Sequence, residues 1–162
     1  MKNALLNKSK TTIGIFDSGL GGLTILNQLD SQFSNHKFIY FGDTAHLPYG
    51  TKSNQSIIKF CDNIVEFLIS KGAEIIIIAC HSASAVALSY LKNKYNIPII
   101  DVITPSIQFI LDNINSESIC VLGTSTTISS KTYSKKIKKL SNKIHVEEIE
   151  CPLFVPLVEE SL

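Results

Sequence analysis

Four consecutive isoleucines, Ile75 to Ile78, are the feature of this sequence that most constrains its fold. A short unbroken apolar run predicts a strand buried on both faces, because a strand with one exposed face would alternate apolar and polar residues. The run passes into ACHS at residues 79–82 and then into a small-residue segment at 83–91 that predicts a helix. Such a turn lies at the carboxyl edge of a parallel sheet, where open α/β folds bind ligands.

Cys80 is therefore a thiol at a predicted site mouth, directly before the N-terminus of a helix. The positive end of a helix favours thiolate over thiol, so this position predicts a lowered pKa for Cys80. The alternative is a structural cysteine, because free cysteines are among the most buried residues in proteins. This stretch alone leaves both interpretations open.

The rest of the chain alternates strands with helices, which predicts an α/β fold with a mostly parallel sheet flanked by helices. The sequence predicts strands at 12–16, 37–42, 75–78 and 97–103, and helices at 23–28, 54–71, 83–91 and 105–113. Further strands are predicted at 118–122 and 144–149, and further helices at 129–140 and 154–160. Residues 1–10 are predicted to be a loosely attached tail.

Composition excludes several classes of protein. The chain has 162 residues with a net charge of +1, so it has no overall bias toward nucleic acids or membranes. All 15 basic residues are lysine, which removes guanidinium clamps from any anion site. The four cysteines have neither CxxC nor zinc-site spacing, and no segment resembles a signal peptide or a membrane span. We therefore expect a cytoplasmic protein with reduced thiols that has no metal, nucleic-acid or membrane partner.

Other candidate residues lie in turns and helices that flank the strands. The turn DSGLGG at residues 17–22 has the shape of a phosphate cradle, but its leading Asp17 would repel phosphate and attract an ammonium group. Ser18 could bind a small polar ligand, while a helix cap or an Asx-turn is the alternative role for both residues. Tyr49 offers an amphipathic ring to a ligand, or packs on the surface. Cys61 and Cys120 are predicted to lie in the core, and the lysine-rich helix at 129–140 to present a solvated face.

Five motifs together resemble the glutamate racemases, which are cofactor-independent members of the aspartate/glutamate racemase superfamily. These motifs occur in the order and approximate spacing of that family across nearly the whole chain. They are IGIFDSGLGGLT (13–24), YFGDTAHLPYG (40–50), IACHSASA (78–85), GTSTTISS (123–130) and CPLFVPLVE (151–159).

The resemblance implies a pair of pseudo-symmetric α/β domains with the active site between them. Residues 1–103 would form the first domain, which carries Cys80, and residues 104–162 an incomplete second one. The implied activity interconverts L- and D-glutamate without a cofactor, and D-glutamate feeds peptidoglycan synthesis. By position, Cys80 matches the first catalytic cysteine, and Glu159 matches a glutamate near the second catalytic centre. The residues that match substrate-binding positions are Asp17, Ser18, Tyr49, Gly50, His81 and Ser82.

The sequence departs from the family in two places. The usual CNT is CHS here, so an imidazole replaces an amide at His81; it could acidify Cys80, occupy substrate space or have no role. The GCTHYP-like motif with the second catalytic cysteine is absent from the 162 residues, and racemisation needs two opposed bases. We therefore expect this polypeptide alone not to racemise glutamate at a useful rate. It would be a fragment, half of a split enzyme that pairs with a complementing C-terminal fragment, or the product of a decaying gene.

Three other functions compete with glutamate racemisation. The chain could act on aspartate or another small dicarboxylate within the same superfamily. As a partner, a homodimer is the alternative to the complementing C-terminal fragment. It could be an inactive dicarboxylate-binding module. A cysteine hydrolase is disfavoured, because His36, His46 and His145 have no matching catalytic motif.

Overall fold

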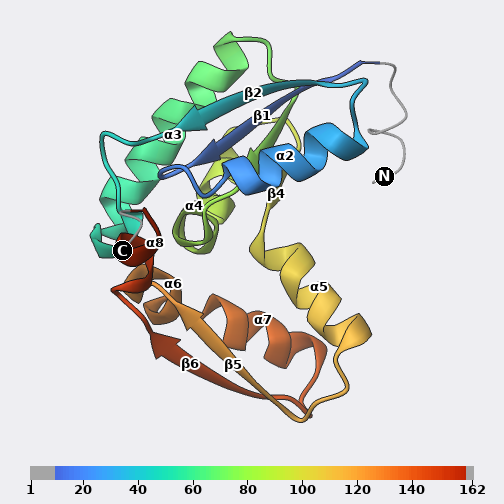
Figure 1. Ribbon diagram of the computed structural model, residues 1–162, viewed down its shortest axis with the longest axis vertical. Helices are drawn as coiled ribbons and strands as arrows, with labels where there is room; N and C mark the ends of the chain where they lie inside the picture. The colour runs from blue at the N-terminus through green and yellow to red at the C-terminus, as the bar shows by residue number, and fades with distance from the viewer. Residues whose placement is uncertain (1–9, 160–162) are drawn as a thin grey trace.

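The computed structural model describes residues 10–159 and contains a four-stranded parallel sheet in its upper half (Figure 1). The strand order is β2-β1-β3-β4 and every pairing is parallel, so helices connect the strands that follow one another in the sequence. The strands are β1 (Thr12–Asp17), β2 (Lys37–Gly42), β3 (Ile75–Ile78) and β4 (Ile99–Asp101). The α/β class with a parallel sheet is thus confirmed, although β4 is shorter than the segment 97–103 that the sequence predicted.

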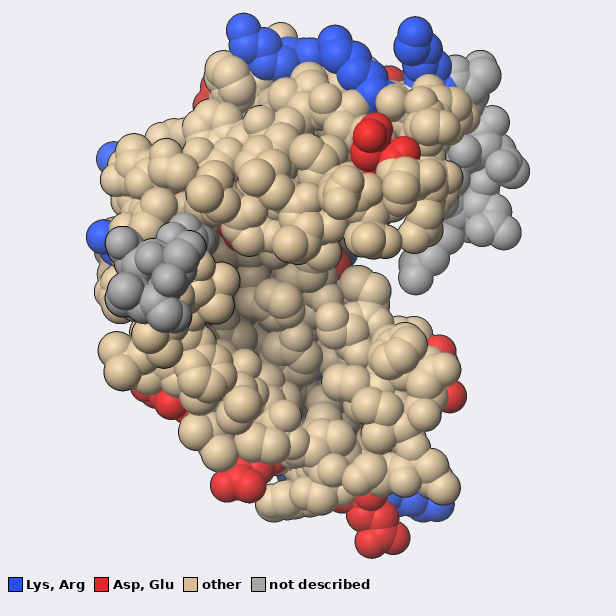
Figure 2. Space-filling model, viewed as in Figure 1, with Lys and Arg blue, Asp and Glu red and all other residues tan. Residues whose placement is uncertain are grey.

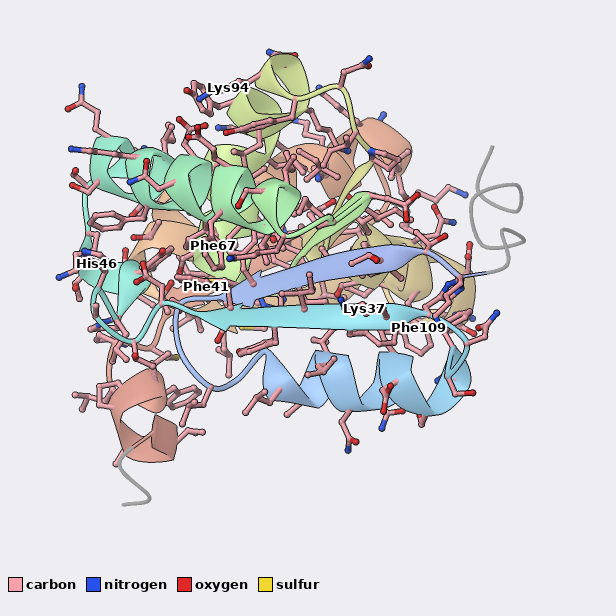
Figure 3. The ribbon with its side chains drawn as sticks, turned by 90° about the horizontal axis from the view of Figure 1, so that it is seen from above. Lys37, Phe41, His46, Phe67, Lys94 and Phe109 are labelled. Atoms are coloured by element: carbon pink, nitrogen blue, oxygen red, sulfur yellow. The ribbon has the colours of Figure 1, made fainter. Side chains whose placement is uncertain are left out.

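Helices cover both faces of this sheet. Helix α2 (Leu23–Gln32) packs on one face, while α3 (Asn54–Ser70) and α4 (His81–Lys94) pack on the other (Figure 3). Strand β3 is buried between them, with Ile75 facing α2 and Ile76 facing α3. Burying a side chain of this size contributes about 1.5–3 kcal/mol, so the isoleucine run fixes the position of β3 within the sheet.

Helix α3 begins after a capping serine and ends before a glycine, close to the bounds 54–71 that the sequence predicts. The Ser53 hydroxyl accepts a hydrogen bond from the Ser56 backbone N–H at 3.2 Å, which caps the N-terminus. Gly72 has a φ of +90° directly after the helix, a conformation that glycine adopts without a Cβ penalty. Cys61 lies on the apolar stripe of α3 and is fully buried, as predicted.

A second, two-stranded parallel sheet lies in the lower half of Figure 1. It pairs β5 (Ser118–Gly123) with β6 (His145–Glu150) and is joined to the first sheet through α5 (Ile103–Asn113). Helices α5 and α7 (Thr132–Leu140) pack Ile107 and Ile137 against one face of it. Helix α8 (Phe154–Glu159) follows. The division into domains at residues 103 and 104 stays a prediction, and the two sheets lie on either side of it.

The helix predicted at 129–140 begins three residues later, as α7, and a separate short helix, α6 (Ser125–Ser129), occupies the predicted turn before it. Lys131 separates them in a left-handed conformation with φ of 55°. Hydroxyl groups compete with helical hydrogen bonds here: Ser130 donates to the Thr127 carbonyl at 2.6 Å and accepts from the Thr132 N–H at 3.1 Å. The run of serines and threonines therefore ends one helix and starts another.

Cys120 is exposed, which contradicts its assignment to the core. Strand β5 alternates, so Ile119 and Val121 face α7 while Cys120 and Leu122 face the opposite, uncovered side. The predicted tail at 1–10 lies outside the described residues up to position 9. Among residues 10–159, no helix has both the length and the apolar content that crossing a bilayer requires.

Candidate functional site

The two halves of the molecule meet at a cavity of about 480 Å³ (Figure 2 shows the surface hollowed between them). Its walls come from the turn after β1, the short η1 helix (Tyr49–Thr51), the turn after β3, and the start of α6. The residues that match the first catalytic cysteine and the substrate-binding positions all line this one cavity: Asp17, Ser18, Tyr49, Gly50, Cys80, His81 and Ser82. The carboxyl edge of a parallel sheet therefore brings together residues that are up to 65 positions apart.

Cys80 sits at the N-cap of α4 and is 7% exposed. Its Sγ donates a hydrogen bond to Ser18 Oγ at 3.5 Å, which joins the β1 and β3 turns. Burial raises the pKa of the Cys80 thiol above its usual value, and the Asp17 charge raises it further. Hydrogen bonds from Ala83 and Ser18 act in the opposite direction but do not outweigh burial. The predicted lowering of this pKa is therefore wrong for the unliganded chain.

This electrostatic setting predicts how the reactivity of Cys80 depends on pH. We expect alkylation by iodoacetamide to rise through a midpoint above that of an ordinary cysteine, because only the thiolate reacts. Removing the charge with Asp17→Asn should move the midpoint to lower pH, because Asp17 disfavours the thiolate. Peptide-resolved mass spectrometry separates Cys80 from exposed Cys120, which serves as the internal reference. A midpoint unchanged by Asp17→Asn would contradict this account.

Asp17 is the last residue of β1 and is 7% exposed. Its Oδ2 accepts hydrogen bonds from the backbone N–H groups of Gly19 at 3.0 Å and Gly22 at 3.2 Å. The Asx-turn role considered from the sequence is thus present, and it holds the carboxylate in the cavity wall. A Cβ on Gly22 would lie 2.6 Å from the Asp17 Cβ, so this turn needs glycine there.

A set of hydroxyl groups joins the first half of the molecule to the second beside the cavity. Ser82 Oγ lies 2.8 Å from Thr124 Oγ1 and 3.4 Å from Thr127 Oγ1. Thr126 Oγ1 donates to the Gly50 carbonyl at 3.0 Å and to the Tyr49 carbonyl at 3.3 Å. The α6 segment therefore holds both the η1 helix and the start of α4.

Sequence reasoning missed several residues that line the cavity from the second half: Thr124, Thr127, Tyr133, Cys151, Phe154 and Val155. The GTSTTISS turn signalled the first two, since it is a second glycine turn at a sheet edge, but no role followed from it. Cys151 lines the same cavity as Cys80, although it does not match the family's second cysteine. The side chain of Glu159 lies outside the described residues.

His81 is the first residue of α4, and its ring stacks on Tyr133 of α7. The ring centroids are 6.4 Å apart and the ring planes are inclined by 14°. Burial lowers the pKa of His81, while the charges of Asp17 and Asp101 oppose that shift. The imidazole is therefore mainly neutral at pH 7 and does not supply the positive charge that could acidify Cys80.

No cluster of three or more histidine, cysteine, aspartate or glutamate side chains in the described part of the chain could hold a metal ion. The chemistry that this site offers comes from one buried thiol, one buried carboxylate and several hydroxyl and backbone N–H groups. Such a set can hold a small amino acid and exchange a proton with it.

Comparison with known proteins identifies the relatives of this chain. A family model described as Asp/Glu/Hydantoin racemase matches residues 13–160. A glutamate racemase of Geobacter metallireducens is 42% identical over 91% of this chain, and one of Aquifex pyrophilus is 41% identical over 93%. The chain spans 55% and 58% of the lengths of these two relatives.

Solved structures give the same result. A Francisella tularensis glutamate racemase in complex with D-glutamate superposes with a TM-score of 0.86 at 42% identity, covering 93% of this chain and 56% of that one. A Bacillus anthracis glutamate racemase gives a TM-score of 0.89 at 33% identity, covering 92% and 56%. An aspartate racemase of Picrophilus torridus, at 16% identity and a TM-score of 0.64, shares the fold.

Proposed function

Since the chain belongs to the Asp/Glu/hydantoin racemase family, we propose that its cavity is the glutamate site of a glutamate racemase. Cys80 would be one of the two thiols that transfer protons, and the D-glutamate made would feed peptidoglycan synthesis in the cytoplasm. The observation that carries this proposal is the convergence of all seven motif residues on one cavity, with the Cys80 sulfur 3.5 Å from Ser18 Oγ.

Charge and hydrogen-bonding capacity suggest how glutamate is held. Asp17 binds the substrate ammonium group, because its carboxylate is the acid that lines the cavity beside Cys80. The hydroxyl groups of Ser18 and Ser82 and the backbone N–H groups at the start of α4 bind carboxylates. No arginine is present in the chain, so carboxylate binding depends on these weaker donors.

Proton transfer follows from this placement. The Cys80 thiolate takes the α-proton, and the electron pair of the C–H bond moves into the substrate carboxylate, where fixed donors stabilise it. A second acid on the opposite face returns a proton and inverts the centre. The raised pKa of Cys80 means that the unliganded thiol is protonated at neutral pH. The bound ammonium group offsets the Asp17 charge, and so favours the thiolate when substrate is present.

The partner that completes such a site is part of the proposal. The uncovered face of the second sheet, the turn before α8 and α8 itself carry exposed apolar side chains, at Leu122 (54%), Leu153 (67%) and Val158 (79%) respectively. Surfaces of this kind are normally covered. A complementing C-terminal fragment would cover them and bring the second thiol, and a homodimer is the alternative. The mass of the purified chain measured by light scattering distinguishes a monomer from a homodimer.

Glutamate is expected to bind more tightly than aspartate. We expect one enantiomer of glutamate to bind at least about tenfold more tightly than either enantiomer of aspartate, because one methylene in a fitted pocket is worth a factor of about 10 to 200. Isothermal titration calorimetry with all four ligands measures the difference. Tighter binding of aspartate would instead favour the alternative of a racemase for a shorter dicarboxylate.

A further inference from the structure

Asp43 is a buried carboxylate outside the cavity to which the proposed mechanism gives no role. It follows β2 directly and is 6% exposed. Its backbone N–H donates to the Asp17 carbonyl at 2.9 Å, so it lies beside the turn that carries the substrate-binding acid. Burying a carboxylate is costly unless partners satisfy its oxygens, so its contacts reveal what it supports.

Two side chains from the loop after β2 engage this carboxylate. The Tyr49 hydroxyl donates to Asp43 Oδ2 at 2.6 Å, and His46 Nδ1 lies 2.8 Å from Asp43 Oδ1. The His46 ring stacks on Phe60 of α3, with centroids 4.0 Å apart and planes inclined by 21°. His46 lies beside the N-terminal end of α3 (Figure 3). The Asp43 carboxylate therefore ties both His46 and Tyr49, and so the loop that carries them, to the end of β2.

This arrangement changes what Tyr49 can offer a ligand. Its ring is 1% exposed, and its hydroxyl proton is already given to Asp43. Burial, followed by the hydrogen bond to Asp43, raises the pKa of Tyr49 well above its usual range, so the hydroxyl stays protonated. What Tyr49 presents to the cavity is therefore its ring and its backbone, whose carbonyl accepts from Thr126 Oγ1 at 3.3 Å.

We propose that Asp43 is a positioning residue: it anchors the Tyr49 hydroxyl and thereby fixes the Tyr49–Gly50 backbone at the cavity mouth. His46, held against Phe60, keeps the second carboxylate oxygen in place. The inference rests on the proposed function only in taking glutamate as the ligand that this backbone meets. It predicts that loss of the anchor loosens the η1 helix first and weakens glutamate binding as a consequence.

The test compares Asp43→Asn with Asp62→Asn. Asp62 is a matched control on α3, because it also accepts from a tyrosine hydroxyl (Tyr95, 2.8 Å) and a nitrogen (Lys94, 2.6 Å), but it does not line the cavity. Two quantities are measured. The first is the hydrogen-exchange rate of the Lys52 amide, which donates to the Tyr49 carbonyl at 3.0 Å, and the second is the glutamate Kd. Asp43→Asn should raise both by about tenfold, the effect of losing one charge-assisted hydrogen bond. Asp62→Asn should change neither.

Tyr49→Phe provides the second variant, because it deletes one hydroxyl and keeps the ring. As a single variant it should raise both the Lys52 exchange rate and the glutamate Kd, and it should add little to Asp43→Asn, because both remove the same bond. Unchanged Lys52 exchange in Asp43→Asn, or an equal rise of the glutamate Kd in Asp62→Asn, would overturn the inference. If the parent chain binds no glutamate, the proposed function fails, and Lys52 exchange still decides whether Asp43 positions the loop.

Discussion

Glutamate incubated with this chain in D2O is expected to gain deuterium at its α-carbon in one enantiomer, without accumulation of the other. Cys80 lines the cavity on the first half of the molecule and can remove and return a proton on one face of the substrate. Exchange with retention needs one base, whereas inversion needs a second acid on the opposite face. Cys80→Ser should lower the exchange rate by at least about a hundredfold, the lower end of what a general base contributes. Proton NMR of the α-hydrogen and chiral chromatography measure the two outcomes separately.

Cys151→Ser is the matched control for this experiment. Cys151 also lines the cavity, but the resemblance gives it no catalytic role. We expect its replacement to leave deuterium exchange unchanged. Robust formation of D-glutamate from L-glutamate by the chain alone would contradict the one-thiol account, and loss of that activity in Cys151→Ser would identify the second acid. Exchange that persists at the parent rate in Cys80→Ser would remove Cys80 from the mechanism.

The second large effect is expected at Gly50, where the two halves of the molecule touch. A Cβ there would lie 2.6 Å from Thr124 Cβ and 2.8 Å from Thr124 Cγ2. Gly50→Ala should therefore push the η1 helix away from α6, break the bond from Thr126, and lower the free energy of unfolding by about 1–3 kcal/mol. We expect the glutamate Kd to rise by at least about tenfold as well, because the displacement of Thr124 would also disturb its hydrogen bond with Ser82, which lines the cavity.

Gly21→Ala is the comparison variant for Gly50→Ala. Gly21 also lines the cavity, but its nearest contact for a new Cβ is Asp17 Oδ2 at 3.7 Å, an ordinary van der Waals distance. Chemical denaturation and calorimetry on both variants measure unfolding and glutamate binding. Binding by Gly50→Ala that matched the parent chain would show that the contact with Thr124 does not shape the cavity.

The sheet was predictable because its signals are local. The isoleucine run of β3 and the apolar stripe of α3 each lie within one segment of the chain, and both were confirmed. The alternation of strands with helices is read from a series of such segments, and it was confirmed as well. The exposure of Cys120 was not predictable, because it depends on which face of β5 the helices cover. The start of α7 at Thr132 instead of residue 129 depends on hydroxyl hydrogen bonds around Ser130, which compete with the helical hydrogen bonds that the sequence pattern predicts there.

The candidate site likewise has features that the sequence predicted and features that it did not. Residues at the carboxyl ends of β1 and β3 were found from the sequence, because a parallel sheet places such ends at one edge. The direction of the Cys80 pKa was predicted wrongly. The helix N-terminus that favours the thiolate is visible in the sequence, whereas the burial and the nearby Asp17 charge that oppose it arise from residues 63 positions away and from tertiary packing. Thr124 and Thr127 were missed for the same reason, since they reach the cavity only when the second half packs on the first.

The central claim is that the Cys80 sulfur lies in the pocket that holds glutamate. The most direct test is the alkylation rate of Cys80, resolved by peptide mass spectrometry, with and without glutamate. At a glutamate concentration about ten times its Kd, the account predicts that alkylation of Cys80 slows by about tenfold, while exposed Cys120 reacts at an unchanged rate. Equal alkylation of Cys80 in the presence and absence of saturating glutamate would contradict it.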